Sequence, residues 1–261
     1  MLAASSCDHL LGGRVRFYQP IKGYRAAMDG VMLASCLPRV TKGRVLELGV
    51  GTGMAGLCFL ARLPKAARVD YVGLEKQPRL VAYSRWNFRV NGFATQARIV
   101  VGDMRLAHPC LRDGSFDLVF VNPPWHVHKD KGAPQDKERA VALFLGQLRL
   151  QDWLYGVARR VKRGGSLAFI IDGRQEQAAQ QILFRLGGWH IEHSWRLFAY
   201  QGDKQAKRVV VLAGKSTKTH KRRGGGVSPL VLHDGTGLTP AAEGMLRARA
   251  NRACQTRLGV P

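Results

Sequence analysis

The stretch Arg44-Val-Leu-Glu-Leu-Gly-Val-Gly-Thr-Gly53 decides the fold class, because a short apolar run ends directly in a glycine-rich turn. Residues 44–48 are typical of a buried strand, and residues 54–63, which precede Pro64, have the pattern of a helix. Glycines at a strand-to-helix junction permit a tight turn and let a ligand approach the backbone amides at the start of the helix. The stretch therefore predicts a ligand-binding turn in an α/β sheet.

Strands and helices alternate along the rest of the chain. Further strands are predicted at 69–74, 97–101, 116–121 and 166–171, and further helices at 77–90, 137–161 and 176–186. Residues 190–197 and 208–212 are expected to close the sheet as an antiparallel hairpin. This alternation predicts an open, mostly parallel sheet with helices on both faces.

The composition changes after Gly214. Residues 204–223 contain eight Lys and Arg residues and no Asp or Glu, and three glycines follow at 224–226. We predict one α/β domain over residues 1–214 and a basic extension over residues 215–261, with the glycine run as a flexible joint. A last helix is expected from Thr239 to about residue 252.

The net charge points to a polyanionic partner. The 261 residues include 41 Lys and Arg against 18 Asp and Glu, which gives a formal net charge of +23. A field of that sign attracts nucleic acid first and anionic membrane surfaces second, and no basic amphipathic helix with an aromatic face supports a membrane. Uncharged apolar stretches such as residues 54–61 are far shorter than the roughly 20 residues of a membrane span.

The cysteines and histidines indicate a reduced, metal-free protein. The five cysteines are odd in number, widely spaced and form no Cys-x-x-Cys pair: Cys7, Cys36, Cys58, Cys110 and Cys254. His126 and His128 have no Cys or carboxylate at ligand spacing, so no metal site is expected. Residues 1–13 lack the basic start and apolar run of a signal peptide, and a cytoplasmic location is expected.

An acidic residue follows the glycine-rich turn at the spacing of a nucleoside-binding site. Glu75 closes the second strand, 24 residues after Gly51, where a carboxylate can accept hydrogen bonds from ribose hydroxyls. The turn lacks the Lys-Ser/Thr of a phosphate-binding loop, which disfavours ATP. A nucleoside-containing cofactor is therefore favoured over a tight loop that binds no ligand.

A second motif, Asn122-Pro123-Pro124-Trp125, follows the strand at 116–121. Ligand chemistry in open α/β sheets takes place at the carboxyl ends of strands. Proline fixes the backbone and leaves its carbonyl free to accept, so the Asn122 side chain and the Pro123 carbonyl can receive both hydrogens of a planar amino group. Trp125 offers a face for stacking a flipped-out base, and a rigid turn after a buried strand is the simpler alternative.

The two motifs resemble those of S-adenosylmethionine (SAM) methyltransferases. The turn, with Glu47 two residues before its first glycine, is similar to motif I of these enzymes, and SAM is cationic at its amino and sulfonium groups. The resemblance implies that the cofactor is held by seven residues: Glu47, Gly49, Gly51, Gly53, Glu75, Asp103 and Asp29. Asp103 would contact the adenine amino group, although alone it would fit a helix cap; Asp29 could equally be a helix N-cap.

Asn-Pro-Pro-aromatic resembles motif IV of amino-methyltransferases that act on adenine N6, guanine N2 or glutamine N5. Residues 19–33, 205–209 and 229–243 are similar, more narrowly, to bacterial tRNA1(Val) (adenine-37-N6)-methyltransferases, and the similarity extends from about residue 14 to 250. Trp125 departs from the usual Tyr or Phe, and the basic run at 215–223 is expanded.

The resemblance implies a Rossmann-like class I SAM methyltransferase domain over residues 1–214. Its expected sheet is mostly parallel, has seven strands and ends in an antiparallel C-terminal hairpin. Residues 14–43 are expected to form a segment that covers the cofactor and the substrate. The implied activity is N6-methylation of adenine in tRNA by a cytoplasmic monomer. Asn122, Pro123, Pro124 and Trp125 would be the catalytic residues.

RNA contacts are expected from six basic residues: Arg25, Arg139, Arg208, Lys221, Arg222 and Arg223. Any single one of them could instead be a solvated surface charge. Three functional alternatives stay open: methylation of guanine N2 in rRNA, methylation of a protein glutamine, and a non-catalytic module that binds SAM and RNA.

Overall fold

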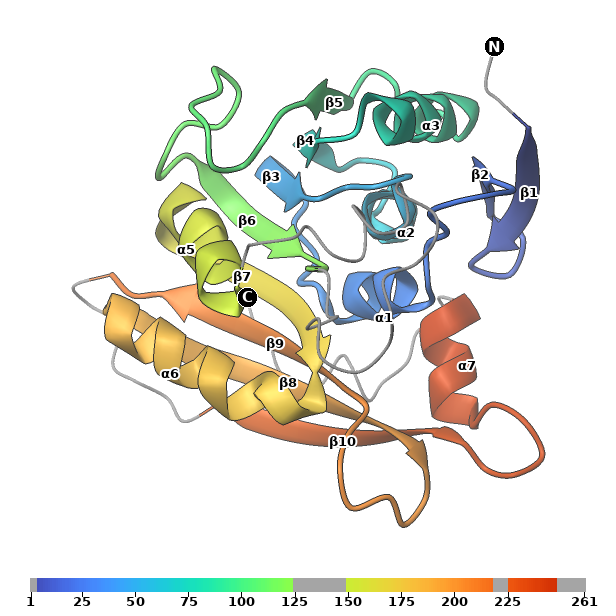
Figure 1. Cartoon of the computed structure of the whole chain (residues 1–261), viewed down its shortest axis with the longest axis vertical. Coiled ribbons are helices and arrows are strands. Elements are labelled where there is room, and N and C mark those ends of the chain that lie inside the picture. The colour runs from blue at the N-terminus through green and yellow to red at the C-terminus, as the bar shows by residue number, and fades with distance from the viewer. Residues whose placement is uncertain (1–3, 124–148, 218–224, 248–261) are drawn as a thin grey trace.

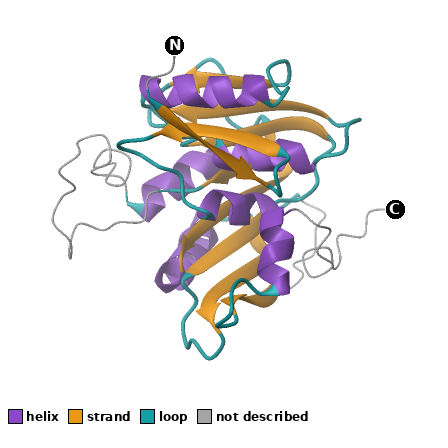
Figure 2. Ribbon diagram, turned by 90° about the vertical axis from the view of Figure 1, so that its right-hand side faces the viewer, coloured by secondary structure: helices purple, strands orange, loops and turns teal. Residues whose placement is uncertain are grey.

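The computed structural model describes residues 4–123, 149–217 and 225–247, and its centre is a twisted sheet with helices on both sides (Figures 1 and 2). The strands of this sheet are β3 (Lys42–Leu48), β4 (Arg68–Glu75), β5 (Ala97–Val101), β6 (Phe116–Val121), β7 (Val161–Asp172), β8 (Trp189–Tyr200), β9 (Arg208–Lys215) and β10 (Gly226–His233). The helices are α1 (Asp29–Cys36), α2 (Met54–Arg62), α3 (Pro78–Val90), α5 (Leu150–Arg160), α6 (Glu176–Leu186) and α7 (Pro240–Arg247), with a 3-10 turn at Gly173–Gln175. A separate hairpin is formed by β1 (Ser5–Leu10) and β2 (Val15–Pro20).

The strand order is β10-β8-β9-β7-β6-β3-β4-β5. Strand β9 runs antiparallel to both of its neighbours, β7 and β8, and every other pair in this sheet is parallel. The mostly parallel sheet and the antiparallel hairpin predicted from the sequence are thus confirmed. The sheet has eight strands, one more than predicted, because β10 adds to the outer edge of β8.

The described part of the predicted C-terminal extension is continuous with the core. Strand β10 pairs with β8, and α7 packs against α1, where the Met245 carbonyl accepts hydrogen bonds from Ser35 (3.0 Å) and Arg62 (3.0 Å). Helix α7 begins as the sequence predicts, since the Thr239 hydroxyl accepts the Ala242 N–H at 3.2 Å. The composition change after residue 214 therefore does not coincide with the end of the folded sheet.

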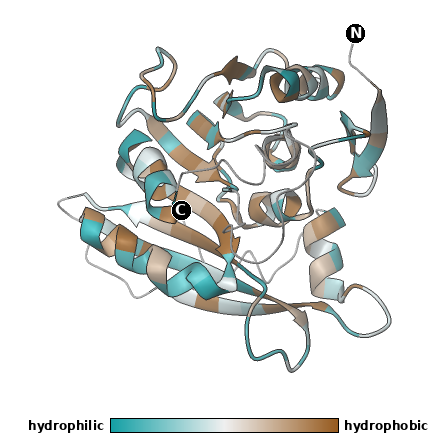
Figure 3. Ribbon diagram, viewed as in Figure 1, coloured by the Kyte–Doolittle hydropathy of each residue, from teal (hydrophilic) through white to brown (hydrophobic). Residues whose placement is uncertain are grey.

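Both faces of the sheet centre are covered, which is why central strands such as β6 and β9 are nearly continuous apolar runs. In β6, Leu118 and Phe120 face the layer that contains α1, α2 and α7, and Val119 and Val121 face the layer that contains α5 and α6. All four side chains are fully buried. Helices α5 and α6 alternate between hydrophobic and hydrophilic residues along their length, as one-sided burial requires (Figure 3). None of the helices in the described part combines the length and apolar character needed to cross a membrane.

The β1–β2 hairpin is attached to the core by two asparagines one turn apart, Asn87 on α3 and Asn91 directly after its last residue. Asn87 accepts the Tyr18 N–H at 2.8 Å and donates to the Tyr18 carbonyl at 2.7 Å. Asn91 does the same for Arg16, at 2.9 and 2.7 Å. The two side-chain amides thus replace a neighbouring strand along β2. Asn87 also donates to the Thr52 carbonyl at 2.9 Å, so it joins the hairpin to the glycine-rich turn.

This arrangement predicts unequal roles for the two asparagines. Asn87 is fully buried, so Asn87→Ala leaves a backbone N–H and two carbonyls without partners and should lower the free energy of unfolding by about 2–4 kcal/mol. Asn91→Ala, nearer the surface, should cost about 1 kcal/mol. Urea denaturation of both variants measures the difference. Equal losses would contradict a special role for Asn87.

Candidate active site

The glycine-rich turn and the Asn-Pro segment lie side by side because of the strand order. The chain moves outward from β3 to β4 and β5 and then returns to β6 on the other side of β3. Leu48 and Val121, the last residues of β3 and β6, are partners in register. Gly49 and Asn122 therefore leave the sheet from neighbouring positions at the carboxyl edge, the switch point where open α/β sheets bind ligands.

The turn has a backbone that requires glycine. Gly51 and Gly53 have φ angles of 55° and 96°, in the left-handed region that side chains disfavour. A Cβ on Gly51 would lie 3.0 Å from the Tyr24 hydroxyl, and one on Gly53 would lie 2.8 Å from the Phe88 ring. The turn is thus closely surrounded, by the segment before α1 on one side and by α3 on the other.

Glu75 lies beside this turn as the sequence predicts. Its carboxylate accepts hydrogen bonds from the N–H groups of Gly51 (3.1 Å) and Gln77 (2.9 Å). The side chain is almost completely buried, and burial raises its pKa above the ordinary value, against the effect of these hydrogen bonds. Glu75 therefore holds the turn and still presents carboxylate oxygens at the end of β4.

Glu47 has a different environment from the one that the motif suggests. It shares a face of β3 with Val45, under α2, and is 3% exposed. Its carboxyl group accepts hydrogen bonds from the Tyr71 hydroxyl and from the Gly56 N–H. Burial raises the pKa of Glu47 to about 8, the Tyr71 and Gly56 hydrogen bonds oppose that rise, and nearby Glu75 adds to it. Protein groups thus occupy much of this carboxyl's hydrogen-bonding capacity.

Tyr24 reaches the turn from the segment that leads into α1. Its hydroxyl lies close to Gly51, and burial is the main reason why its pKa is raised. Three nearby carboxylates raise that pKa further: Glu75, Glu47 and Asp29. These acids come from β4, β3 and α1, so three acidic side chains surround the turn inside a strongly basic chain, and one of them, Glu47, keeps its proton up to about pH 8. A cationic ligand fits such a site.

Asp29 does not act as the helix cap considered from the sequence. Helix α1 starts at Asp29 itself, its N-cap position is Met28, and no side chain caps it. The Asp29 carboxylate pairs with Arg208 at 3.2 Å, and Arg208 is the first residue of β9. Arg25, another predicted RNA contact, pairs with Asp8 at 3.4 Å in the hairpin.

Asp103 follows β5 at the same edge of the sheet, and basic side chains already contact it. Arg105 donates to both of its carboxylate oxygens, and Lys76 lies 3.2 Å away. Arg105 is the main reason why the pKa of Asp103 is well below its usual range. The carboxylate also accepts the Arg105 N–H at 3.0 Å, which makes a local turn rather than a helix cap. An adenine amino group would have to share this carboxylate with Arg105.

Asn122 carries an unsatisfied acceptor at the carboxyl end of β6. Its side-chain oxygen is buried, and within the described ranges no group donates a hydrogen bond to it. A buried acceptor without a donor costs about 1–3 kcal/mol, and a ligand that donates a hydrogen bond to this oxygen would remove that cost. Pro123 is buried beside it. The other predicted residues lie outside the described ranges: Pro124, Trp125, Arg139, Lys221, Arg222 and Arg223.

Two aromatic residues near the turn, Tyr71 and Trp153, contact the site in ways that their sequence patterns do not predict. Tyr71 is the partner of Glu47, and the only sequence signal for it is the two-residue alternation that places Val69 and Tyr71 on one face of β4. Trp153 is 4% exposed in the core, as its helical spacing predicts. Its ring also lies 3.4 Å from where a Cβ of Gly49 would be, so it limits the turn on the α5 side.

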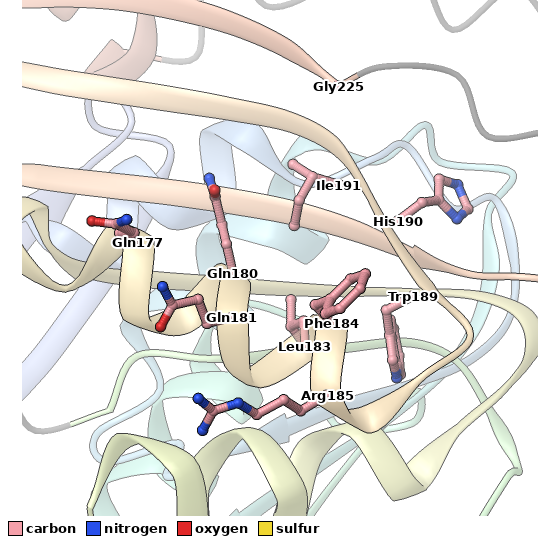
Figure 4. Close-up of a pocket in the computed structure, with 10 residues that line it drawn as sticks. All are labelled: Gln177, Gln180, Gln181, Leu183, Phe184, Arg185, Trp189, His190, Ile191 and Gly225. Carbon is pink, nitrogen blue, oxygen red and sulfur yellow. The ribbon is translucent and has the colours of Figure 1, made fainter.

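A pocket of about 550 Å³ lies elsewhere, between the end of α6 and the start of β8 (Figure 4). Gln180, Phe184, Trp189 and Ile191 are among its lining residues. Strand β8 runs in the same direction as β7, so Trp189 lies at the amino edge of the sheet, away from the glycine-rich turn. This pocket is therefore separate from the candidate site. Among the described residues no group of His, Cys, Asp or Glu is placed to hold a metal ion.

Comparison with known proteins agrees with this geometry. Residues 28–146 match the family model of the methyltransferase small domain. A tRNA1(Val) (adenine(37)-N6)-methyltransferase from Tolumonas auensis is 25% identical over 200 residues, which cover 76% of this chain and 80% of that protein. A protein of the same name from Shewanella putrefaciens is 24% identical over 216 residues, with 82% and 87% covered. The structure of a predicted O-methyltransferase from Agrobacterium tumefaciens has a TM-score of 0.62 at 21% identity, and the match covers 87% of this chain and 97% of that one.

The fold and the family model define the class: this chain is a SAM-dependent methyltransferase with the class I fold. The resemblance to tRNA1(Val) (adenine(37)-N6)-methyltransferases seen in the sequence is confirmed by relatives that cover most of the chain. SAM fits the described residues, because three acidic side chains surround a glycine-rich turn and the cofactor is cationic.

The environment of Glu47 makes stability depend on pH in a defined direction. Because its pKa is raised to about 8 in the folded chain, the folded state keeps a proton that the unfolded state loses above about pH 4.5. The native chain should therefore lose stability relative to Glu47→Gln as pH rises from 5 to 8. Urea denaturation across this range measures it. A difference in unfolding free energy between Glu47→Gln and the native chain that stays constant across this range would contradict the assignment.

Proposed function

We propose that this methyltransferase transfers the methyl group of SAM to the exocyclic N6 of an adenine in tRNA. The observation that carries the proposal is the buried side-chain oxygen of Asn122, which has no hydrogen-bond donor among the described residues and lies at the strand end next to the glycine-rich turn. An acceptor in that position suits an amino group, which has two hydrogens to donate. The names of the relatives from Tolumonas auensis and Shewanella putrefaciens support adenine N6 in tRNA as the acceptor.

In the proposed reaction the Asn122 oxygen and the Pro123 carbonyl accept the two hydrogens of the adenine amine. Holding both hydrogens fixes the plane of the amine and turns its nitrogen toward the methyl donor, which favours in-line transfer. When bound, SAM supplies an electrophilic methyl group on a sulfonium. No strong general base is needed, because the nitrogen becomes acidic once methylated and its proton can then leave. Pro124 would keep the segment rigid, and Trp125 would stack on the base.

On the cofactor side we assign the backbone of Gly49, Gly51 and Gly53 to close packing against SAM, since the N–H groups of these glycines donate within the protein. We assign Glu75 to the ribose hydroxyls of SAM. Glu75 is favoured because two backbone N–H groups hold its carboxylate in place at the end of β4. The Asp103 carboxylate would accept a hydrogen bond from the adenine amino group of SAM. To do so it would either keep its ion pair with Arg105 as well or give that ion pair up.

The remaining acids would act without direct contact. Asp29 would attract the cationic end of SAM through its field, since Arg208 already binds its carboxylate. Glu47 keeps its proton up to about pH 8 and would instead support the turn through its hydrogen bonds with Tyr71 and Gly56.

The proposal includes a monomer that works in the cytoplasm, where tRNA and reduced thiols coexist. Four cysteines lie in the described ranges and all four are free, including Cys36 and Cys58 in the core. Arg25, Arg139, Arg208, Lys221, Arg222 and Arg223 remain proposed RNA contacts. Arg25 and Arg208 would reach phosphate while sharing their carboxylate partners.

Substitution of Asn122 tests the proposal. Asn122→Ala should lower methyl transfer to tRNA by more than about 100-fold, because a transition-state contact worth about 3 kcal/mol is lost. SAM affinity, measured by calorimetry, should stay within about twofold because Asn122 faces the acceptor rather than the cofactor. Asn122→Asp keeps the acceptor oxygen and should retain intermediate activity. Full turnover by Asn122→Ala would refute the assignment of Asn122.

A further inference from the structure

Two segments of this chain carry positive charge with no acid among them. Residues 76–102 include five Lys and Arg and no Asp or Glu, and residues 9–28 include four Lys and Arg and no Asp or Glu. The two segments together carry nine positive charges, and no acid within either segment offsets them.

The fold brings these two segments together. Helix α3 belongs to the first and β2 to the second, and Asn87 and Asn91 bind β2 along the helix. Figure 1 shows α3 and the hairpin as neighbours at the side of the molecule that carries β4 and β5. Helix α3 starts three residues after Glu75, so the combined surface begins at the candidate cofactor site and leads away from it.

Three arginines on this surface are fixed without being neutralised. Arg16 donates to the Val90 carbonyl at 2.8 Å and Arg85 to the Ile99 carbonyl at 2.9 Å. The guanidinium of Arg89 lies 4.7 Å above the ring of Trp86. None of the three pairs with a carboxylate among the residues that the structure describes. A carbonyl or an aromatic ring orients a guanidinium and leaves its charge and its other N–H groups for a ligand.

Arg85, Trp86 and Arg89 form one continuous group at the surface. Arg85 and Arg89 are four residues apart and so lie on the same side of α3. The partly exposed Trp86 packs edge-on against Tyr18 of β2, with ring centroids 6.2 Å apart. Arg16 binds the carbonyl of Val90, the residue after Arg89, which places it at the end of the same row.

We propose that this α3 face, made of Arg16, Arg85, Trp86 and Arg89, binds the phosphate backbone of the RNA acceptor. The inference rests on the proposed function, which supplies a polyanionic substrate. Arginine is well suited to phosphate because its planar N–H groups can donate in pairs. A lipid surface fits less well, because binding in the interface needs exposed apolar side chains and the described α3 carries no large one that is exposed.

The test compares salt dependence of tRNA binding in two double variants of the full chain. Arg85→Gln/Arg89→Gln removes two charges from the α3 face. Arg112→Gln/Arg163→Gln removes two exposed charges at the amino edge of the sheet and is the matched control. Affinity for fluorescently labelled bulk tRNA is measured by anisotropy between 50 and 300 mM KCl. Each lost phosphate contact should reduce the slope of log affinity against log salt by about 0.7–0.9.

We expect the α3-face variant to lose about 1.5 in slope and about tenfold in affinity at 100 mM KCl, and the control to keep the native slope. Arg85→Lys/Arg89→Lys keeps both charges and should retain most of the slope, which separates charge from folding. SAM binding by calorimetry should be unchanged in all variants.

Three results would overturn the proposal. A native slope in Arg85→Gln/Arg89→Gln, or an equal loss in the control, would contradict the α3 face while leaving the proposed function intact. Failure of the unaltered chain to bind tRNA would contradict both. The unaltered chain could also be found to bind phosphatidylcholine vesicles that contain 30% phosphatidylserine more tightly than tRNA. That result would make an anionic membrane, rather than RNA, the partner of the α3 face.

Discussion

The whole site depends on the pairing of β3 with β6. Leu48 and Val121 are opposite each other in register, so the turn after one strand and the Asn-Pro segment after the other start from the same edge of the sheet. The buried apolar residues of β6 fix that register, because a shift by one residue would reverse which layer each side chain enters. The packing of the core therefore sets the distance between the glycine-rich turn and the Asn-Pro segment. The loops after the two strands only need to supply the side chains and backbone groups that contact the ligands.

A contrast of charge runs through the molecule. The chain carries a formal charge of +23, and its candidate cofactor site is surrounded by three acidic side chains, two of them almost completely buried. Burying carboxylates costs free energy, and the raised pKa values of Glu47 and Glu75 express that cost. An acidic site suits a cationic small molecule, and a basic surface suits a polyanionic macromolecule. The two ligands would meet at one edge of the sheet.

Much of the site could be predicted from the sequence because the decisive residues are close in the chain to strand ends. Gly51, Gly53 and Glu75 needed only the strand-turn-helix pattern, and Asn122 needed the Asn-Pro-Pro-Trp motif at the end of an apolar run. Other features depend on tertiary contacts. Burial under α2 made Glu47 a partner of Tyr71, and Arg105, only two residues away, occupies Asp103.

The eighth strand was missed for a different reason. Pro229 lies in the middle of β10 and argues against a strand, but an edge strand tolerates proline on its unpaired side, and β10 is the edge of the sheet. The glycines at 224–226 and the basic run before them also suggested a linker, and only the pairing with β8 shows that the sheet continues.

The central claim is that this edge transfers a methyl group from SAM to an adenine amine in tRNA. The most direct measurement incubates the full chain with methyl-labelled SAM and, in parallel, unmodified tRNA, rRNA and cellular protein, followed by nucleoside mass spectrometry and amino-acid analysis. The account predicts label as N6-methyladenosine in tRNA. Label recovered as N2-methylguanosine or methylglutamine, or no transfer to any acceptor by a chain that still binds SAM, would contradict it.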